Sequence, residues 1–280
     1  MKKLFSVIIS LMIANMILAQ STATFVVLTK GQKISVKNDV TIDADFGMGM
    51  LLNSTSVSIN ALQVKDSSTN SYTISNSLTK LKANMNMMGQ NNSYDSDNKS
   101  GNNEDMARIF DEKMNKITDV VIDKNTGMAI AKKQEESKTD EDTANVSENM
   151  MKIFSNSSDE GVVDGAFEIL PAGKKTGDTW ADTSNSKESK SIRTYTLQLI
   201  NGNDAVVKME MTIKAKNKLD FQGMEFEITT DTKTTGQIIF DINTGLVKNR
   251  NSESDITGSF QMMGQDMPIT AKTTSKTEYN

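Results

Sequence analysis

Two stretches of the chain, VVIDKNTG at Val120–Gly127 and IIFDINTG at Ile238–Gly245, determine the fold class. Each consists of three apolar residues of the kind found in strands, followed by an Asp-x-Asn-Thr-Gly turn. Such a turn between two strands is typical of a β-hairpin whose glycine adopts the left-handed conformation. Because the same hairpin occurs twice, the sequence predicts two related β-rich halves.

Shorter matches extend this duplication beyond the two hairpins. The residues Ala61–Val64 correspond to Thr196–Leu199, and a turn at Gly31 corresponds to a turn at Gly177. Between these landmarks most of the chain alternates apolar and polar residues with a period of two, which predicts antiparallel strands with one buried and one solvated face. One such run has its apolar positions at Val207, Met209, Met211 and Ile213.

Two segments, 103–116 and 140–154, interrupt the alternation. Both begin with acidic residues and repeat apolar residues at helical spacing, so each is predicted to form an amphipathic helix with negative charge at its N-terminus. Their apolar positions include Met106, Phe110, Met150 and Phe154.

The first of these helices is an addition to the repeat. The offset between the halves is 134 residues at Gly89 but 118 at Gly127, and the difference is about the length of a helix with its loop. We therefore expect a mainly β protein: a large curved antiparallel sheet or half-barrel from two pseudo-repeats, with two amphipathic helices in the middle. The helices are expected to lie on the concave, apolar face.

Residues 1–19 have the features of a signal peptide. Lys2 and Lys3 precede an apolar run, Leu4–Leu18, and the following alanine fits cleavage before Gln20. The run is shorter than the ~20 residues that span a bilayer. We expect a soluble mature protein that is exported, to the periplasm rather than to the cell exterior.

The mature chain is predicted to divide at a polar segment, Ser155–Gly161 (SNSSDEG). Residues 20–160 would form the first β-rich half with both helices, and residues 161–280 the second half. The chain contains no cysteine, so it has neither a site for a lipid anchor on cysteine nor a disulfide.

Composition excludes several classes of function. The net charge of −5 argues against nucleic acids and anionic lipid headgroups as partners, since both require a basic surface. The chain contains no histidine, which excludes the commonest general base, the Ser-His and Cys-His nucleophile systems and most catalytic zinc sites. We predict a protein that is not an enzyme and has no cofactor.

A carboxylate-based hydrolase remains as an alternative. Asp95, Asp97, Glu104 and Asp105 lie close together in sequence, and two carboxyl groups suffice for glycoside hydrolysis. We interpret this cluster as a solvated loop that leads into a helix with acidic residues in its first turn.

Methionine is the one unusual chemical feature, with 19 residues in the chain. Two clusters lie beside Gly-Gln turns, at Met85, Met87 and Met88 and at Met262, Met263 and Met267. They admit three interpretations: filling of an irregular core, lining of an adaptable apolar groove, or binding of Cu(I) by thioethers.

The order of motifs resembles a family of exported proteins common in Bacteroidetes that is classed as a domain of unknown function. The motifs are KGQKISV, SYDSDNKSGNNEDMARIF, LPAGKKTGDTW, TGQIIFDINTGLV and QMMGQDMPITAKTTSKT. The resemblance covers essentially the whole mature chain. It implies a β-rich envelope protein without known activity and transfers no catalytic residue.

From these observations we expect a non-enzymatic exported protein whose concave, Met-rich face holds a lipid-like ligand or an apolar segment of another envelope protein. Cu(I) handling through the methionine clusters is the alternative from another class. The candidate ligand-binding residues are Met106, Phe110, Met150, Phe154, Met209 and Met211. Sequence leaves open whether this face is a groove or a closed core.

Overall fold

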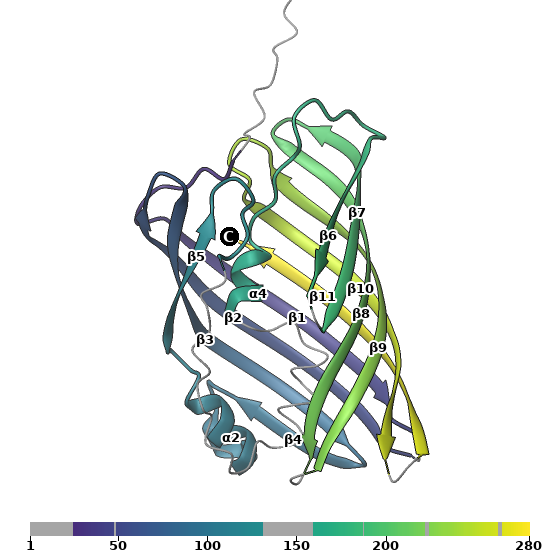
Figure 1. Cartoon of the computed structure of the whole chain (residues 1–280). Coiled ribbons are helices and arrows are strands. Elements are labelled where there is room, and N and C mark those ends of the chain that lie inside the picture. The colour runs from purple at the N-terminus through teal and green to yellow at the C-terminus, as the bar shows by residue number, and fades with distance from the viewer. Residues whose placement is uncertain (1–24, 48, 131–158, 187, 222–223, 263–264) are drawn as a thin grey trace, which may run out of the picture.

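The alternating segments form eleven strands that pair into one antiparallel sheet (Figure 1). The computed structural model describes residues 25–47, 49–130, 159–186, 188–221, 224–262 and 265–280, so the predicted signal peptide and the predicted helix at 140–154 lie outside the described residues. The strands are β1 (Lys33–Asp45), β2 (Leu51–Ser67), β3 (Ser71–Met87), β4 (Gln90–Asp95), β5 (Ile117–Asp123), β6 (Thr179–Asn185), β7 (Ser189–Asn201), β8 (Asp204–Phe221), β9 (Met224–Asp241), β10 (Val247–Met262) and β11 (Gln265–Tyr279). The helices are η1 (Lys99–Gly101), α2 (Glu104–Asp111) and α4 (Asp159–Asp164).

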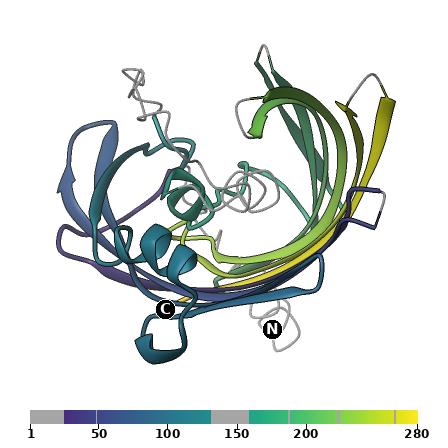
Figure 2. The same cartoon turned by 90° about the horizontal axis from the view of Figure 1, so that it is seen from below.

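The strands follow the order β4-β3-β2-β1-β11-β10-β9-β8-β7-β6, and β5 pairs with β3 beyond the end of β4. The order is linear, so the sheet is open, with β4 and β5 at one edge and β6 at the other. The sheet curves into a trough, and α2 and α4 lie on its concave side (Figure 2). The predicted fold class, a large curved antiparallel sheet with few helices, is confirmed.

The hydrogen bonds confirm the pseudo-repeat in detail. The Gly31 N–H donates to the Val64 carbonyl at 2.8 Å, and the Gly177 N–H donates to the Leu197 carbonyl at 2.8 Å. One residue after each of these carbonyls, the pairing with the next strand shifts by a β-bulge. Val64 therefore corresponds to Leu197, two positions from Leu199, where the short sequence match placed it.

The predicted extra helix is an insertion that splits one strand in two. Lys82 pairs with Asp95 of β4, and five positions earlier on β3 Ser77 pairs with Ile117 of β5. In the second half, β8 corresponds to β3, and a single continuous strand, β9, pairs with it where β4 and β5 pair with β3. The intervening α2 begins at Asn103, whose side chain accepts bonds from the backbone N–H groups of residues 105 and 106, as expected for a cap followed by two acidic residues.

The segment predicted as a link between the halves is partly helical. Helix α4 starts at Asp159, inside the predicted link Ser155–Gly161, and continues to Asp164. Its apolar Val163 and the following Ala166 and Phe167 are buried against the sheet. The polar composition of SNSSDEG gave no indication of a helix, because the apolar residues that pack α4 against the sheet come after that motif.

Side chains on the concave side, called the inner face, form two large apolar clusters, and a smaller third one lies under α2. The upper cluster contains α4, the loop after it and the upper part of the sheet, with Val163, Phe167, Tyr195, Leu197, Ala205, Met209 and Phe240 among its members. The lower cluster consists of Ile42, Ala44, Phe46, Leu52, Met85, Ile228, Ile256, Ile269 and Ala271. "Upper" and "lower" refer to Figure 1.

A band of polar side chains separates the two large clusters on the inner face. This band, called the polar belt, includes Asn38, Thr234, Ser254, Ser275 and Thr277. Asn38 accepts bonds from the hydroxyls of Ser275 at 3.1 Å and Thr277 at 2.9 Å. The hydroxyls of Thr234 and Ser254 lie 2.8 Å apart. These cross-strand bonds pair polar groups that water reaches poorly, as buried polar groups require. The inner face is thus apolar, then polar, then apolar along the strands.

Candidate functional site

The predicted ligand-binding residues fall into separate places. Met209 is 4% exposed in the upper cluster, and Met211 occupies the next inner position on β8. Met106 is 5% exposed on α2, with Phe110 one turn further. Two further predicted residues, Met150 and Phe154, lie outside the described residues.

Helix α2 packs on the edge of the sheet, in a corner cluster of its own. Met106 joins Leu81, Ala83 and Tyr94 there, and the ring of Phe110 lies 5.2 Å from that of Tyr94. The Tyr94 hydroxyl donates to Asp111 at 2.8 Å. Burial and the Asp111 carboxylate raise the pKa of Tyr94 to about 12. The helix is thus anchored by both apolar packing and a hydrogen bond.

Helix α2 and the two methionines of β8, Met209 and Met211, therefore lie in different parts of the sheet. β3, on which α2 packs, and β8, which carries both methionines, are six positions apart in the strand order. Met106 and Phe110 belong to the corner cluster, whereas Met209 belongs to the upper cluster. The insertion point of α2 in an edge strand places it far from β8, and helical periodicity alone could not reveal this.

The lower cluster is formed by strands and one turn, and its members are each 7% exposed or less. Its members come from β1, β2, β3, β9, β10, β11 and the turn after β1. Among the described residues no helix contributes to it, whereas α4 contributes to the upper cluster. At its boundary with the polar belt, the Thr273 hydroxyl is buried and has no hydrogen-bond partner within the described structure.

A buried ionic group lies beside the upper cluster. Arg250 of β10 and Glu168, from the loop after α4, form an ion pair at 3.3 Å with side chains that are 19% and 13% exposed. Burial raises the pKa of Glu168, and the charges of Arg250 and Arg193 oppose that rise. Arg193 donates to the Tyr195 hydroxyl at 3.0 Å. The pair ties the loop after α4 to the sheet.

Sequence reasoning missed this group, although a signal was present. The chain has three arginines, and two of them, Arg193 and Arg250, occupy inward positions of alternating strands. A charged residue on the apolar face of a strand predicts a buried partner. That partner, Glu168, follows Phe167 in a segment where no periodicity pointed inward.

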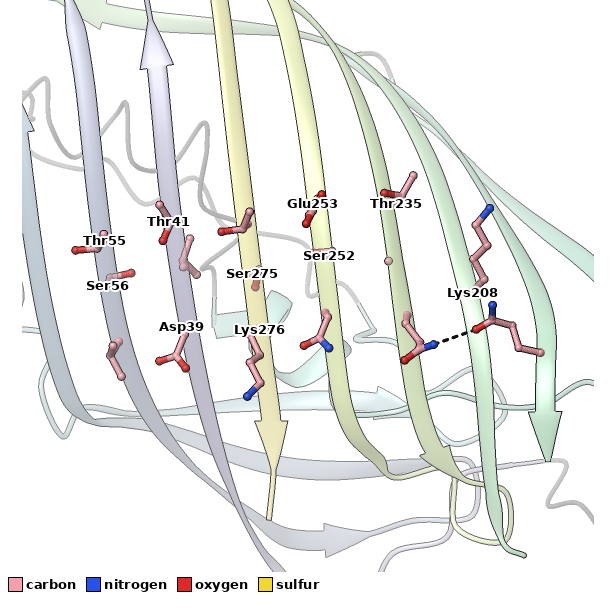
Figure 3. A pocket seen from close by; sticks show the side chains of 17 residues that line it. Asp39, Thr41, Thr55, Ser56, Lys208, Thr235, Ser252, Glu253, Ser275 and Lys276 are labelled. Carbon is pink, nitrogen blue, oxygen red and sulfur yellow. Dashed lines mark hydrogen bonds between the residues drawn. The ribbon is translucent and has the colours of Figure 1, made fainter. Parts of the chain in front are cut away.

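A shallow polar groove of about 710 Å³ lies on the opposite face of the sheet (Figure 3). It crosses seven strands and is lined by hydroxyl, amide and charged groups, among them Asp39, Thr41, Gln237, Asn251, Glu253 and Lys276. Asp39 accepts from Lys37 at 3.0 Å through one carboxylate oxygen, while the other is buried without a partner in the described structure. No aromatic side chain lines the groove, so it lacks the stacking surface that sugar sites use.

The acidic loop before α2 contains the carboxylates on which the hydrolase alternative depends. Asp95 and Asp97 form ion pairs with Lys82 and Lys80. The Asp97 backbone N–H that donates to Asp95, together with Lys82, lowers the pKa of Asp95 below its usual value. A general acid needs the opposite shift. In the described part of the chain, no three acidic side chains converge as a carboxylate metal site would require.

Comparisons with known proteins place the chain in a family without an assigned activity. The sequence profile of one family, described as a family of unknown function (DUF6263), matches residues 69–247. A search of curated proteins found no match. None of the helices in the described ranges is long and apolar enough to cross a bilayer.

Among solved structures, the chain is similar to one from a study of lipid–protein interactions in lipovitellin, with 11% identity and a TM-score of 0.45. That match covers 90% of this chain and spans 25% of the lipovitellin chain. An outer membrane channel of Pseudomonas putida F1 has 8% identity and a TM-score of 0.26, covering 91% of this chain and 98% of the channel. OccK5 (OpdH) of Pseudomonas aeruginosa has 6% identity and a TM-score of 0.24, covering 89% of this chain and 98% of its own.

Proposed function

Because the chain belongs to the DUF6263 family, whose function is unknown, we propose a function from the geometry of its sheet: the inner face binds a lipid-like ligand. The protein would act as a non-enzymatic binding protein that is exported to the periplasm. The apolar part of the ligand would lie on the lower cluster, and its polar end would reach the polar belt.

The observation that supports this proposal is the composition of the lower cluster. An apolar sheet face is stable in water only when a second layer covers it. Helix α4 and its loop supply that layer for the upper cluster, but among the described residues no helix supplies it for the lower cluster. The members of the lower cluster are 1–7% exposed and pack against one another and against Met50, Met87 and Phe260, so a ligand would enter by displacing these partly buried side chains. An acyl chain is a second layer of the right chemistry, and the adaptable side chain of Met85 suits a ligand of variable shape.

The polar belt would hold the polar end of the ligand. The Thr273 hydroxyl lies where the belt meets the lower cluster, opposite Ile42 on β1. It is buried and, in the described structure, unpaired, which is costly unless a partner arrives. A hydroxyl or ester oxygen of an uncharged headgroup would satisfy it. The hydroxyls of Thr234, Ser254, Ser275 and Thr277 already have hydrogen-bond partners in the belt, whereas that of Thr273 has none in the described structure.

Native mass spectrometry of the protein purified from its own envelope tests the proposal. We expect a population with a bound mass in the range of a lipid, and loss of that mass in Ala271→Trp, which fills the lower cluster. Ala205→Trp is the matched control, because Ala205 is fully buried in the upper cluster, to which α4 contributes.

The two variants show whether the lower cluster is a ligand-binding surface, here called the ligand seat, or a closed core. Overpacking a closed core costs about 1–3 kcal/mol. If the lower cluster is a seat, Ala271→Trp keeps the stability of the parent protein while Ala205→Trp loses stability. Equal destabilisation by both, with no lipid on the parent protein, would show that the lower cluster is an ordinary core and would refute the proposal.

A further inference from the structure

Four pairs of consecutive strands meet at the lower end of the sheet. They are β1 with β2, β3 with β4, β8 with β9 and β10 with β11, and the strand register brings their paired ends to the same end of the sheet. Of the residues that connect them, 48, 222–223 and 263–264 lie outside the described residues. The turns at the other end connect β2 to β3, β7 to β8 and β9 to β10. The two ends can therefore be compared directly.

The two ends differ in composition. The connections at the lower end read FGMGMLL at 46–52, NMMGQNN at 86–92, FQGME at 221–225 and MMGQD at 262–266. The first two contain no charged residue, and the last two contain one carboxylate each. The upper turns read SSTNS at 67–71, NGND at 201–204 and DINTG at 241–245. The lower connections are thus rich in methionine and other apolar residues, and those at 46–52 and 86–92 are uncharged, whereas the upper end has the polar turns usual for a protein in water.

Two large apolar side chains project into solvent at the lower end. Leu51 is 51% exposed and Met88 is 63% exposed. They are neighbours, since the Met88 N–H donates to the Leu51 carbonyl at 3.1 Å. Behind them, Met50 and Met87 are partly buried against the lower cluster. Apolar surface is therefore continuous from the exposed turns to the proposed ligand seat.

Met88 also adopts a backbone conformation that methionine rarely takes. Its φ is +52°, and that of Gly89 is +81°, so both central residues of this two-residue turn are left-handed. Such turns strongly favour Asn-Gly, because asparagine tolerates the left-handed region and a bulky side chain does not. Asn115, with φ +60°, follows this preference elsewhere in the chain. Neither backbone preference nor burial accounts for a methionine at position 88.

We propose that Met88, in the turn between β3 and β4, and Leu51, at the start of β2, insert into the interface of a lipid bilayer with zwitterionic headgroups. Apolar side chains that project from two neighbouring uncharged connections fit a fluid lipid surface, which accepts protruding side chains without a shaped recess. The net charge of −5 disfavours an anionic surface. This contact adds a route for lipid to the inner face but depends on different residues from the proposed ligand seat.

Binding to phosphatidylcholine vesicles tests the proposal. Protein from cells that express the full chain is sedimented with the vesicles, and Met88→Asn is compared with the parent protein. Because Asn-Gly is the preferred sequence for this turn, Met88→Asn should raise the melting temperature while lowering the partition coefficient about ten-fold, the loss expected when a fully buried methionine contact disappears. Misfolding cannot explain that combination.

Met128→Asn is the matched control. Met128 is 43% exposed and follows the Gly127 turn at the upper end of the sheet. We expect its vesicle binding to equal that of the parent protein. All three proteins share the same N-terminal residues, so any contribution of residues 1–19 is common to them.

Several results would overturn the proposal. These are no sedimentation of the parent protein, equal binding by Met88→Asn, or binding that requires an anionic lipid such as phosphatidylglycerol.

Cu(I) titration that saturates the parent but not Met88→Asn, without vesicle binding, would assign the turn to metal instead. Capture of an envelope protein by cross-linking at position 88, again without vesicle binding, would assign it to a protein partner. Ala271→Trp should still bind vesicles, so failure of the ligand seat and failure of the bilayer contact are distinguishable.

Discussion

Gly127 and Gly245, the last residues of the two repeated turns, lie against the same side chain, Val26. A Cβ atom added to Gly127 would be 3.3 Å from the Val26 Cγ2 atom, and one added to Gly245 would be 3.6 Å from it. The Val26 N–H donates to the Lys124 carbonyl at 2.7 Å, and the next N–H donates to Thr244 at 2.9 Å. The two repeats are thus joined at their turns by one short segment from before β1.

Substitution of glycines with a left-handed backbone should lower the free energy of unfolding by unequal amounts, as Gly31 and Gly127 illustrate. Gly31→Ala, at φ +87° with no atom within 4 Å of the new Cβ, should lose about 1 kcal/mol for the left-handed backbone alone. Gly127→Ala should lose more, because its Cβ would lie 2.9 Å from that of Phe167. Urea unfolding of both variants checks the order. Equal losses would mean that the contact with Phe167 relaxes without cost.

The buried ion pair predicts a particular dependence of stability on pH. Because burial raises the pKa of Glu168 above its ordinary 4.5, the folded state binds a proton more tightly than the unfolded state. Glu168 therefore contributes stability that is present below pH 4.5 and is lost as the pH rises through the folded pKa.

Glu168→Gln removes this titration while keeping the shape of the side chain. The free energy of unfolding of the variant, relative to that of the parent protein, should increase from pH 4.5 upward, as measured by urea unfolding at several pH values. A relative stability that falls with pH would show instead that Arg250 outweighs burial and lowers the pKa of Glu168.

Phe110→Asp should undock α2 without unfolding the sheet. Phe110 is partly buried in the small corner cluster, so a carboxylate there should cost about 1–3 kcal/mol locally. Hydrogen exchange should quicken in α2 and β4, while the turn at Gly245 keeps its protection. Arg108→Ala, on the exposed side of the same helix, serves as the control. Loss of protection throughout the sheet would mean that α2 supports the whole fold.

Export predicts a defined N-terminus. Sequencing of the protein from an envelope fraction should begin near Gln20, after removal of residues 1–19. A protein that retains Met1 would contradict cleavage and would show that the N-terminal apolar segment remains in the mature protein.

The fold was predictable from sequence where local chemistry fixes it. The Asp-x-Asn-Thr-Gly turns form the same bonds in both halves: Asp123 and Asp241 each accept from the N–H groups two and three residues later. Asn103 and the acidic residues after it similarly fixed the start of α2. Turns and caps are made by neighbours in sequence, so their patterns are legible without a structure.

The candidate sites were less predictable because they depend on which strands meet. Alternation identifies two faces of a strand but does not reveal that inward positions in the middle of the sheet are Ser, Thr and Asn. Ser275 and Asn38 meet only because β1 pairs with β11, the last strand of the chain. The same holds for the methionines near positions 50 and 88, whose turns share an end only once the register is known.

The insertion of α2 into an edge strand has a consequence for solubility. An open sheet exposes unpaired backbone N–H and C=O groups along its edges, and a long, straight edge strand invites pairing with another molecule. Inner strands such as β8 and β9 run for 18 residues, but the edges of this sheet are short. β6 has 7 residues, and the opposite edge is divided into β4 with 6 and β5 with 7. The helix that breaks the repeat thus protects the protein from aggregating through its own edge.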